Sequence, residues 1–151
     1  MELLNDQFLE RMKMLVHRHT GLPLIEFDID YYEKTTMFMG YNLNEKLIAY
    51  NLPMYEPNKS QTPELAHLSL EEFFEIAIYH EIGHHLDYIA NPNRRLYREM
   101  HVEDATVEFI LEGEVNAYKY GRDLVPDPLI SYYDILNKFN IERRTKIVNK
   151  T

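Results

Sequence analysis

Apolar side chains at the start of the chain recur at helical spacing and predict an amphipathic helix over residues 2–19. The repeating positions are Leu4, Phe8, Met12 and Leu15 or Val16. Gly21 and Pro23 follow directly, and both residue types are typical of the end of a helix.

The pattern then changes to short runs that alternate or are rich in strand-forming residues. These runs span residues 22–30, 36–42 and 46–52, with Asn42 and Asn44 between the last two. We expect a small, mainly antiparallel sheet in which the last two strands form a hairpin and the strand over 46–52 lies at an edge. Residues 53–68 are polar and contain prolines, and we expect a loop there.

Helical patterns dominate the second half of the chain. Ser69 and Glu72 form a capping box that starts a helix over residues 70–90, and the Asn-Pro-Asn sequence at 91–93 interrupts it. A further helix is expected from about Glu99 or Glu103 to Tyr120. A last helix begins at Asp127 and Pro128 and reaches roughly residue 139, and we expect residues 142–151 to be a frayed basic tail.

Composition fits one globular α+β domain over residues 1–151, because 45% of residues are hydrophobic and 27% are charged. The 16 Lys and Arg against 25 Asp and Glu give a net charge of −9, which argues against direct nucleic-acid binding. The absence of cysteine excludes disulfides and cysteine metal ligands. We expect a cytoplasmic protein without a membrane span, since neither a signal peptide nor a long apolar run is present.

The sequence His80-Glu81-Ile82-Gly83-His84 is an H-E-x-x-H motif in the middle of the predicted helix 70–90. Histidines one turn apart on one helix face can both bind a single zinc ion, at about 2.0–2.1 Å. Glu81 projects beside the pair, where it can act as the general base on a water molecule activated by the metal. The alternative is a pair of structural histidines, which would be difficult to satisfy in a mostly buried helix.

A catalytic zinc ion needs a third protein ligand, and Glu114 is the first candidate. It lies in the centre of an apolar stripe of the following helix, where an unpaired carboxylate would be unfavourable. The stripe consists of Val107, Ile110, Leu111, Ala117, Tyr118 and Gly121. Glu103, on the same face, and Asp87, one turn beyond His84, are the competing ligands.

Three further residues have an open role at this stage. Asp87 could instead orient a ligand imidazole, and Tyr118 could hydrogen-bond a developing oxyanion, although packing is the simpler explanation for one of twelve tyrosines. Gly83 either lets a strand or substrate approach the metal or lets two helices pack closely.

These motifs resemble those of the ImmA/IrrE-type zinc metallopeptidases, whose pattern is H-E-h-G-H followed by E-x-E-A-N-x-F-A and a Leu-Met-Pro-like turn. The corresponding segments here are HEIGHHLD and LEGEVNAYKYGRDLVPD, with Val115 in place of Ala and Tyr118 in place of Phe. The likeness covers about residues 35–126 as the core of the domain. It implies a minimal zincin-like, gluzincin-type site with His80, His84 and Glu114 as zinc ligands and Glu81 as the catalytic base.

The resemblance also implies a function, since members of this family cleave or inactivate helix-turn-helix repressors, often in phages and other mobile elements or in stress responses. We therefore expect a metalloprotease that hydrolyses a DNA-binding repressor and acts in transcription regulation, with an extended substrate added to the edge strand. The alternative is a zinc-containing binding module that sequesters such a partner without catalysis. A zinc hydrolase of a non-protein substrate and a SprT-like protease are further alternatives, the latter disfavoured by the missing basic footprint and the E-x-E-x-N run.

Overall fold

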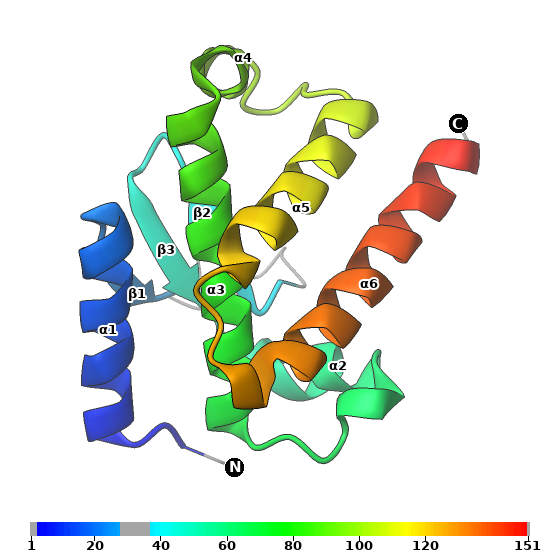
Figure 1. Ribbon diagram of the computed structural model, residues 1–151. Coiled ribbons are helices and arrows are strands. Elements are labelled where there is room, and N and C mark those ends of the chain that lie inside the picture. The colour runs from blue at the N-terminus through cyan, green and yellow to red at the C-terminus, as the bar shows by residue number, and fades with distance from the viewer. Residues whose placement is uncertain (1–2, 28–36, 151) are drawn as a thin grey trace.

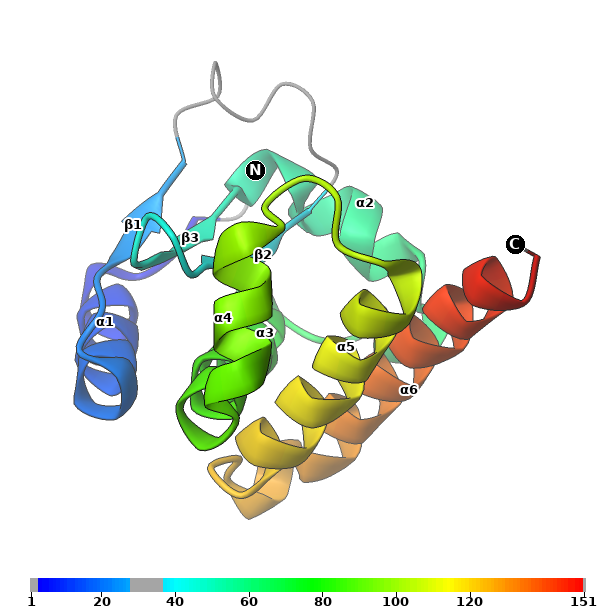
Figure 2. The same cartoon turned by 90° about the horizontal axis from the view of Figure 1, so that it is seen from above.

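A three-stranded sheet and six α-helices make up the described part of the chain, residues 3–27 and 37–150 of a computed structural model (Figure 1). The chain is therefore an α+β protein. The long helix α3 (Leu70–Ala90) is central and packs against the sheet and most other helices. Viewed from above, α1 (Asp6–Thr20) and the sheet lie on one side of α3, and α5 (Val107–Arg122) and α6 (Asp127–Lys150) lie on the other (Figure 2).

Local capping explains where the main helices begin. The Asn5 side chain accepts hydrogen bonds from the backbone of Gln7 and Phe8 at the start of α1. At α3, Ser69 and Glu72 form the predicted capping box, with reciprocal bonds of 3.0 and 3.1 Å. The predicted first helix and the helix over residues 70–90 are thus confirmed.

The hydrophobic core lies between α1, the sheet and the first half of α3. Phe38 packs edge-on against both Phe73 and Phe74, and Phe8 packs against Phe74 from the other side. Helix α6 also contributes, since Tyr133 and Leu136 are buried in the same cluster. The core therefore supports α3 along the segment that precedes His80.

The sheet differs from the expected mainly antiparallel one. Strand β3 (Leu47–Tyr50) is central, pairing antiparallel with β2 (Met39–Asn42) and parallel with β1 (Leu24–Glu26). The predicted hairpin is confirmed, but the expected edge position of residues 46–52 is wrong. The edge strand beside α3 is β2, because β3 is paired on both sides.

Helices also replace two segments for which we expected a loop or a break. Residues 53–68 form 3-10 turns at Leu52–Met54 and Pro63–Leu65 around the short helix α2 (Tyr55–Ser60), and α4 (Pro92–Met100) starts directly after α3. Proline lies in the first turn of both 3-10 segments and of α4, where its missing N–H is not needed. Each of these prolines therefore lies at the start of a helical segment, where the sequence had suggested a loop or a break.

The boundaries of the last two helices were also wrong. Helix α5 begins at Val107, where Thr106 accepts a hydrogen bond from the Phe109 N–H, so Glu103 lies outside it. Helix α6 continues to Lys150 instead of ending near residue 139, so the segment expected to be a frayed tail is helical. The parts of the predicted strands that fall on residues 28–36 lie outside the described residues.

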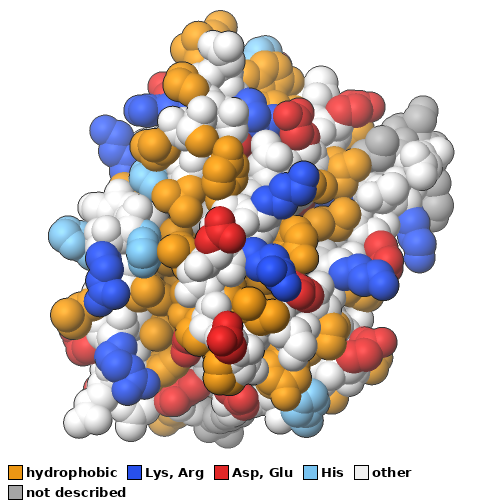
Figure 3. Space-filling view, viewed as in Figure 1, with side chains coloured by type: hydrophobic (Ala, Val, Ile, Leu, Met, Phe, Trp, Pro, Cys, Tyr) orange, Lys and Arg blue, Asp and Glu red, His pale blue; other side chains and the backbone are white. Residues whose placement is uncertain are grey.

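Membrane insertion finds no support in the helices. Within residues 3–27 and 37–150, no helix has both the length and the apolar character needed to cross a bilayer. On the face shown in Figure 3, Lys and Arg side chains alternate with Asp and Glu side chains without forming a continuous basic field.

Candidate metal centre

His80 and His84 lie one turn apart on α3 with their side chains 12% and 15% exposed. Their rings are perpendicular, with centroids 4.8 Å apart. One ligand atom each from His80, Glu81 and His84 lies within 4.8 Å of the others, so this group can hold a metal ion. The predicted pair of histidines therefore shares one site.

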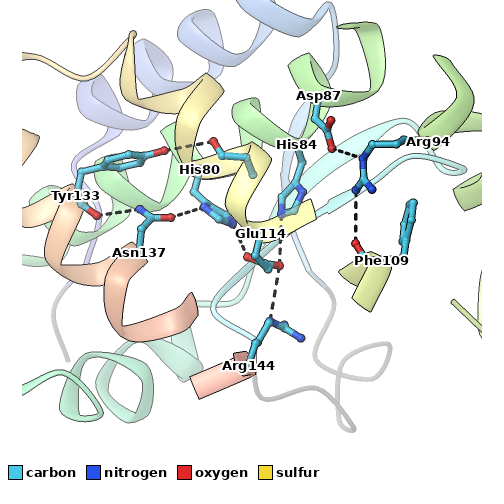
Figure 4. Close-up of polar contacts among 10 residues, drawn as sticks. His80, His84, Asp87, Arg94, Phe109, Glu114, Tyr133, Asn137 and Arg144 are labelled. Carbon is cyan, nitrogen blue, oxygen red and sulfur yellow. Dashed lines mark hydrogen bonds and ion pairs between the residues drawn. The ribbon is translucent and has the colours of Figure 1, made fainter. Parts of the chain in front are cut away.

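Helix α5 brings the Glu114 carboxylate to the same two imidazoles (Figure 4). Its Oε2 lies 2.7 Å from His80 Nε2, and its Oε1 lies 3.5 Å from His84 Nε2. Donor atoms around a tetrahedral zinc ion are separated by roughly 3.3 Å. The two observed distances lie on either side of this value, so two imidazole nitrogens and the two oxygens of one carboxylate converge in a spacing suited to such an ion.

A glycine contact explains how two helices come close enough to form this site. A Cβ atom at Gly83, between the two histidines on α3, would overlap the backbone carbonyl oxygen of Ala117 on α5. Ala117 is one turn from Glu114, so the close approach carries Glu114 toward the histidines. Of the two roles considered for Gly83, the structure supports close helix packing.

Asn137 of α6 orients the first imidazole. Its Oδ1 lies 2.6 Å from His80 Nδ1, and its Nδ2 donates a hydrogen bond to the carbonyl oxygen of Tyr133 (2.8 Å). Because Nδ2 is the donor of this amide, Oδ1 faces His80, and Nδ1 of His80 carries the proton. This arrangement leaves Nε2 of His80 as the atom available to a metal.

The contact between His80 Nε2 and Glu114 Oε2 needs a positive charge between the two atoms. A neutral imidazole protonated on Nδ1 presents a lone pair at Nε2, and an ionised carboxylate also presents only lone pairs. At 2.7 Å the two acceptors require either a proton or a metal cation between them. The donor chemistry of this chain therefore fits a divalent cation at this position.

The pKa values of these groups reflect the same coupling. Burial alone lowers the pKa of His80, but the charge and hydrogen bond of Glu114 outweigh it, with help from Glu81 and Asn137, and raise the pKa to about 9. Burial favours the neutral form of Glu114, yet the neighbouring His80 and His84 hold its pKa well below the usual range.

Glu81 has a different environment from Glu114. Its side chain is only 6% exposed, and its Oε2 atom has no hydrogen-bond partner among the described residues. Burial raises the pKa of this carboxyl group, although the nearby His84 and His80 act in the opposite direction. A buried carboxylate with an unpaired oxygen beside two imidazoles is available to a metal ion or to a water molecule.

The other predicted site residues lie elsewhere. Asp87 is fully buried and accepts hydrogen bonds from Arg94 (Figure 4) and from Asn91 and Asn116, so both of its oxygens already have partners. Glu103 is exposed in a turn before α5. The hydroxyl of Tyr118 donates to Asp134. The structure therefore does not bring these three residues to the metal centre.

Two open cavities meet at the candidate metal centre. The first reaches Met39, Ala77 and Asn140, and the second reaches Tyr41 and Tyr88. Four residues line both cavities, namely Met37, Glu81, Glu114 and Arg144. We call the two cavities together the groove. It passes the metal centre and follows β2 on its way.

Sequence reasoning missed Asn137 and Arg144 as members of this site. Arg144 Nε lies 3.8 Å from Glu114 Oε1, and it belongs to the segment that we had expected to fray. Tyr133, Asn137 and Arg144 share one face of α6, at spacings of four and seven residues. For Asn137 the available signal was a polar residue on the apolar face of the predicted helix. For Arg144 the helix also had to be extended beyond residue 139.

Comparison with family models gives no match, and comparisons with curated proteins and with solved structures give none either. The resemblance to the ImmA/IrrE-type peptidases therefore depends on the two sequence motifs alone and stays a prediction.

Proposed function

We propose that this chain is a zincin-like zinc metallopeptidase, with zinc held by His80, His84 and Glu114. The observation that carries the proposal is the convergence of Glu114 with both imidazoles, beside a second carboxylate, Glu81, that has an unpaired oxygen. Two nitrogens and one oxygen form a donor set typical of catalytic zinc sites, which keep a position open for water or substrate.

Zinc, when bound at such a site, polarises a carbonyl oxygen and makes water a stronger nucleophile near neutral pH. Glu81 takes the proton from the attacking water and returns it to the departing amine. Its raised pKa makes the ionised carboxylate a stronger base than an exposed glutamate, which favours the first of these steps. Asn137 keeps His80 in the tautomer that leaves Nε2 free for the metal.

An extended peptide is the substrate shape that the groove favours. Among the described residues, strand β2 is one of the two edge strands of the sheet, and the segment from Met37 to Leu43 contributes side chains to both cavities. A peptide can pair with such an edge through main-chain hydrogen bonds. This position replaces the edge strand over residues 46–52 that the sequence had suggested.

The proposed natural substrate is a cytoplasmic helix-turn-helix repressor. This part of the proposal rests on the resemblance in the HEIGHHLD and LEGEVNAYKYGRDLVPD segments. The net charge of −9 is compatible with a basic DNA-binding partner.

The test is cleavage of candidate helix-turn-helix repressors from the same genome, followed by mass spectrometry, for the zinc-loaded wild type and Glu81→Gln. We expect specific cleavage by the wild type and a loss of about 10²–10⁴-fold in rate for Glu81→Gln, with zinc content unchanged. Glu108→Gln is the matched control, since Glu108 is exposed on the first turn of α5.

A zinc-loaded wild type that cleaves none of these repressors would contradict the proposed function. Repressor inactivation that persists in Glu81→Gln would also contradict hydrolysis, and it would support the zinc-containing binding module instead.

A further inference from the structure

Arginine side chains flank the candidate metal centre on both sides of the groove. Arg143 lines the first cavity, Arg98 lines the second, and Arg144 lines both. The acidic residues among the described lining residues are Glu81 and Glu114, and both are assigned to the metal centre. Away from the metal centre, each cavity of the groove is therefore lined by arginine without an acidic residue among the described residues, although the net charge of the chain is −9.

Arg98 and Arg143 are held by neutral acceptors, which leaves their charges uncompensated. Arg98 donates to the carbonyl oxygen of His101 (3.4 Å), and Arg143 donates to the Gln61 side chain (2.7 Å). In the described part of the chain, neither forms an ion pair with a carboxylate. Three arginines outside the groove do so, since Arg94, Arg95 and Arg122 pair with Asp87, Glu99 and Asp134.

The two guanidinium groups also belong to different cavities of the groove. Arg98 lies on α4, in the cavity that contains Tyr41 and Tyr88. Arg143 lies on α6, in the cavity that contains Asn140, and its contact with Gln61 joins α6 to the end of α2. A peptide that passes the metal centre would meet one arginine before the reacting bond and the other after it.

We infer that the substrate segment carries acidic side chains on both sides of the scissile bond, and that Arg98 binds those on one side and Arg143 those on the other. This inference rests on the proposed peptidase function. Guanidinium groups bind carboxylates through paired, charge-assisted hydrogen bonds. The rest of the molecule repels acidic peptides on average, so the arginines select such peptides only when they enter the groove. A repressor that is basic overall would thus be cleaved in an acidic segment.

Randomised synthetic peptides, cleaved by the zinc-loaded full chain and analysed by mass spectrometry, test this inference. We expect Asp and Glu to be enriched on both sides of the cleaved bond. Arg98→Gln removes the enrichment on one side and Arg143→Gln removes it on the other. Arg18→Gln, which changes the same charge on the exposed side of α1, is the matched control and retains both.

A defined peptide pair makes the test quantitative. For a peptide with flanking Glu residues, each groove substitution should lower kcat/KM by about two- to five-fold, the range of a partly exposed ion pair. For the same peptide with Gln in place of Glu, the substitutions should lower kcat/KM by less than they do for the Glu peptide, because only the charge-dependent part of the contact is missing. The loss of kcat/KM for the Glu peptide should become smaller at high salt, because exposed charges are screened.

The outcomes separate this inference from the proposed function. Cleavage without acidic enrichment, or enrichment that survives both groove substitutions, overturns the inference and leaves the peptidase in place. If no peptide is cleaved, the same library is passed over immobilised, zinc-loaded Glu81→Gln. Selective retention of acidic peptides would support the charge preference of the groove and contradict hydrolysis. No selective retention would overturn both the charge preference and the peptidase function.

Discussion

At the scale of single residues, the two glutamates of the site occupy opposite environments. Glu114 contacts both imidazoles and has a lowered pKa, whereas Glu81 is buried with an unpaired oxygen and a raised pKa. Two carboxyl groups whose environments separate their pKa values commonly have separate roles in catalysis. This difference supports our proposal that Glu114 is the ligand and Glu81 the group that moves a proton.

Asn137 has one proposed role at the site, to orient the His80 imidazole, and a single substitution can test it. Asn137→Leu removes the acceptor for His80 Nδ1 while filling a similar volume, so His80 loses its fixed tautomer and orientation. We expect zinc affinity to fall by about 10–100-fold in titrations against a competing chelator.

Asn140→Leu is the control, because Asn140 lies on the same helix and lines the groove without a hydrogen bond to either histidine among the described residues. Equal affinity of the wild type and Asn137→Leu would show that Asn137 does not support the metal site.

The sequence carries enough information to find four of the residues at the site. The H-E-x-x-H spacing on a single helix places His80, Glu81 and His84 together, and the apolar stripe around Glu114 indicates that this carboxylate points inward. Asn137 and Arg144 could not be placed in the same way. They reach the site from α6, and nothing in local periodicity specifies which helices lie side by side.

At the scale of helices and strands, the crossing of α3 and α5 decides whether a metal site exists. Gly83 lets the two backbones approach so closely that any Cβ would overlap Ala117. The sequence shows the glycine and both helical stripes, but it does not show which surface meets the glycine. Close packing and access to the metal were therefore equal alternatives until the contact was known.

Gly83→Ala should destabilise the protein and weaken zinc binding, because α5 must move away from α3. We expect a decrease of about 1–3 kcal/mol in the free energy of unfolding, measured by urea denaturation of the metal-free protein. Gly113→Ala is the control, since a Cβ there meets only the flexible end of Arg94 at 3.1 Å. Equal unfolding midpoints for the two variants would refute the packing role of Gly83.

Helices α5 and α6 are joined by an ion pair with a predicted pH dependence. Hydrogen bonds from Arg122, assisted by Tyr118, lower the pKa of Asp134. A lowered pKa in the folded state means that the carboxylate stabilises the fold above its ordinary pKa and loses this effect as pH falls through the folded value.

Asp134→Asn should therefore lower the free energy of unfolding by about 0.5–1 kcal/mol at neutral pH, since both partners are partly exposed. The difference from wild type should narrow below about pH 4, near the ordinary pKa of aspartate. Asp123→Asn, at the exposed end of α5, serves as the control. A difference that stays constant from neutral to acidic pH would exclude this ion pair as its cause.

The order and type of the long helices were predictable, whereas their ends and the sheet arrangement were not. Prolines at 53, 63 and 92 were interpreted as breaks, although each lies in the first turn of a helical segment. Strand order depends on contacts between distant residues, so the alternating pattern could not show that β3 is central. The continuation of α6 past residue 139 was likewise not predicted from the local pattern.

At the scale of the whole molecule, the candidate metal centre lies where three helices and the sheet edge meet. His80 and His84 come from α3, Glu114 comes from α5, Asn137 comes from α6, and β2 follows the groove. A metal ion at this position joins α3 to α5, so binding should stabilise the folded state as a whole. The net charge of the chain is −9, whereas the arginines of the groove are positively charged. The overall charge therefore acts on solubility, and the arginines act on a ligand only within the groove.

The central claim is a single zinc ion held by His80, His84 and Glu114, with Glu81 outside the ligand set. The most direct measurement is zinc content per chain, by mass spectrometry of untagged protein, for the wild type, Glu114→Gln, Glu81→Gln and the exposed control Glu108→Gln. The account predicts about one zinc per chain in the wild type, Glu81→Gln and Glu108→Gln, and a large loss in Glu114→Gln. Zinc retained in Glu114→Gln but lost in Glu81→Gln would make Glu81 the third ligand, and no zinc in the wild type would contradict the metal centre itself.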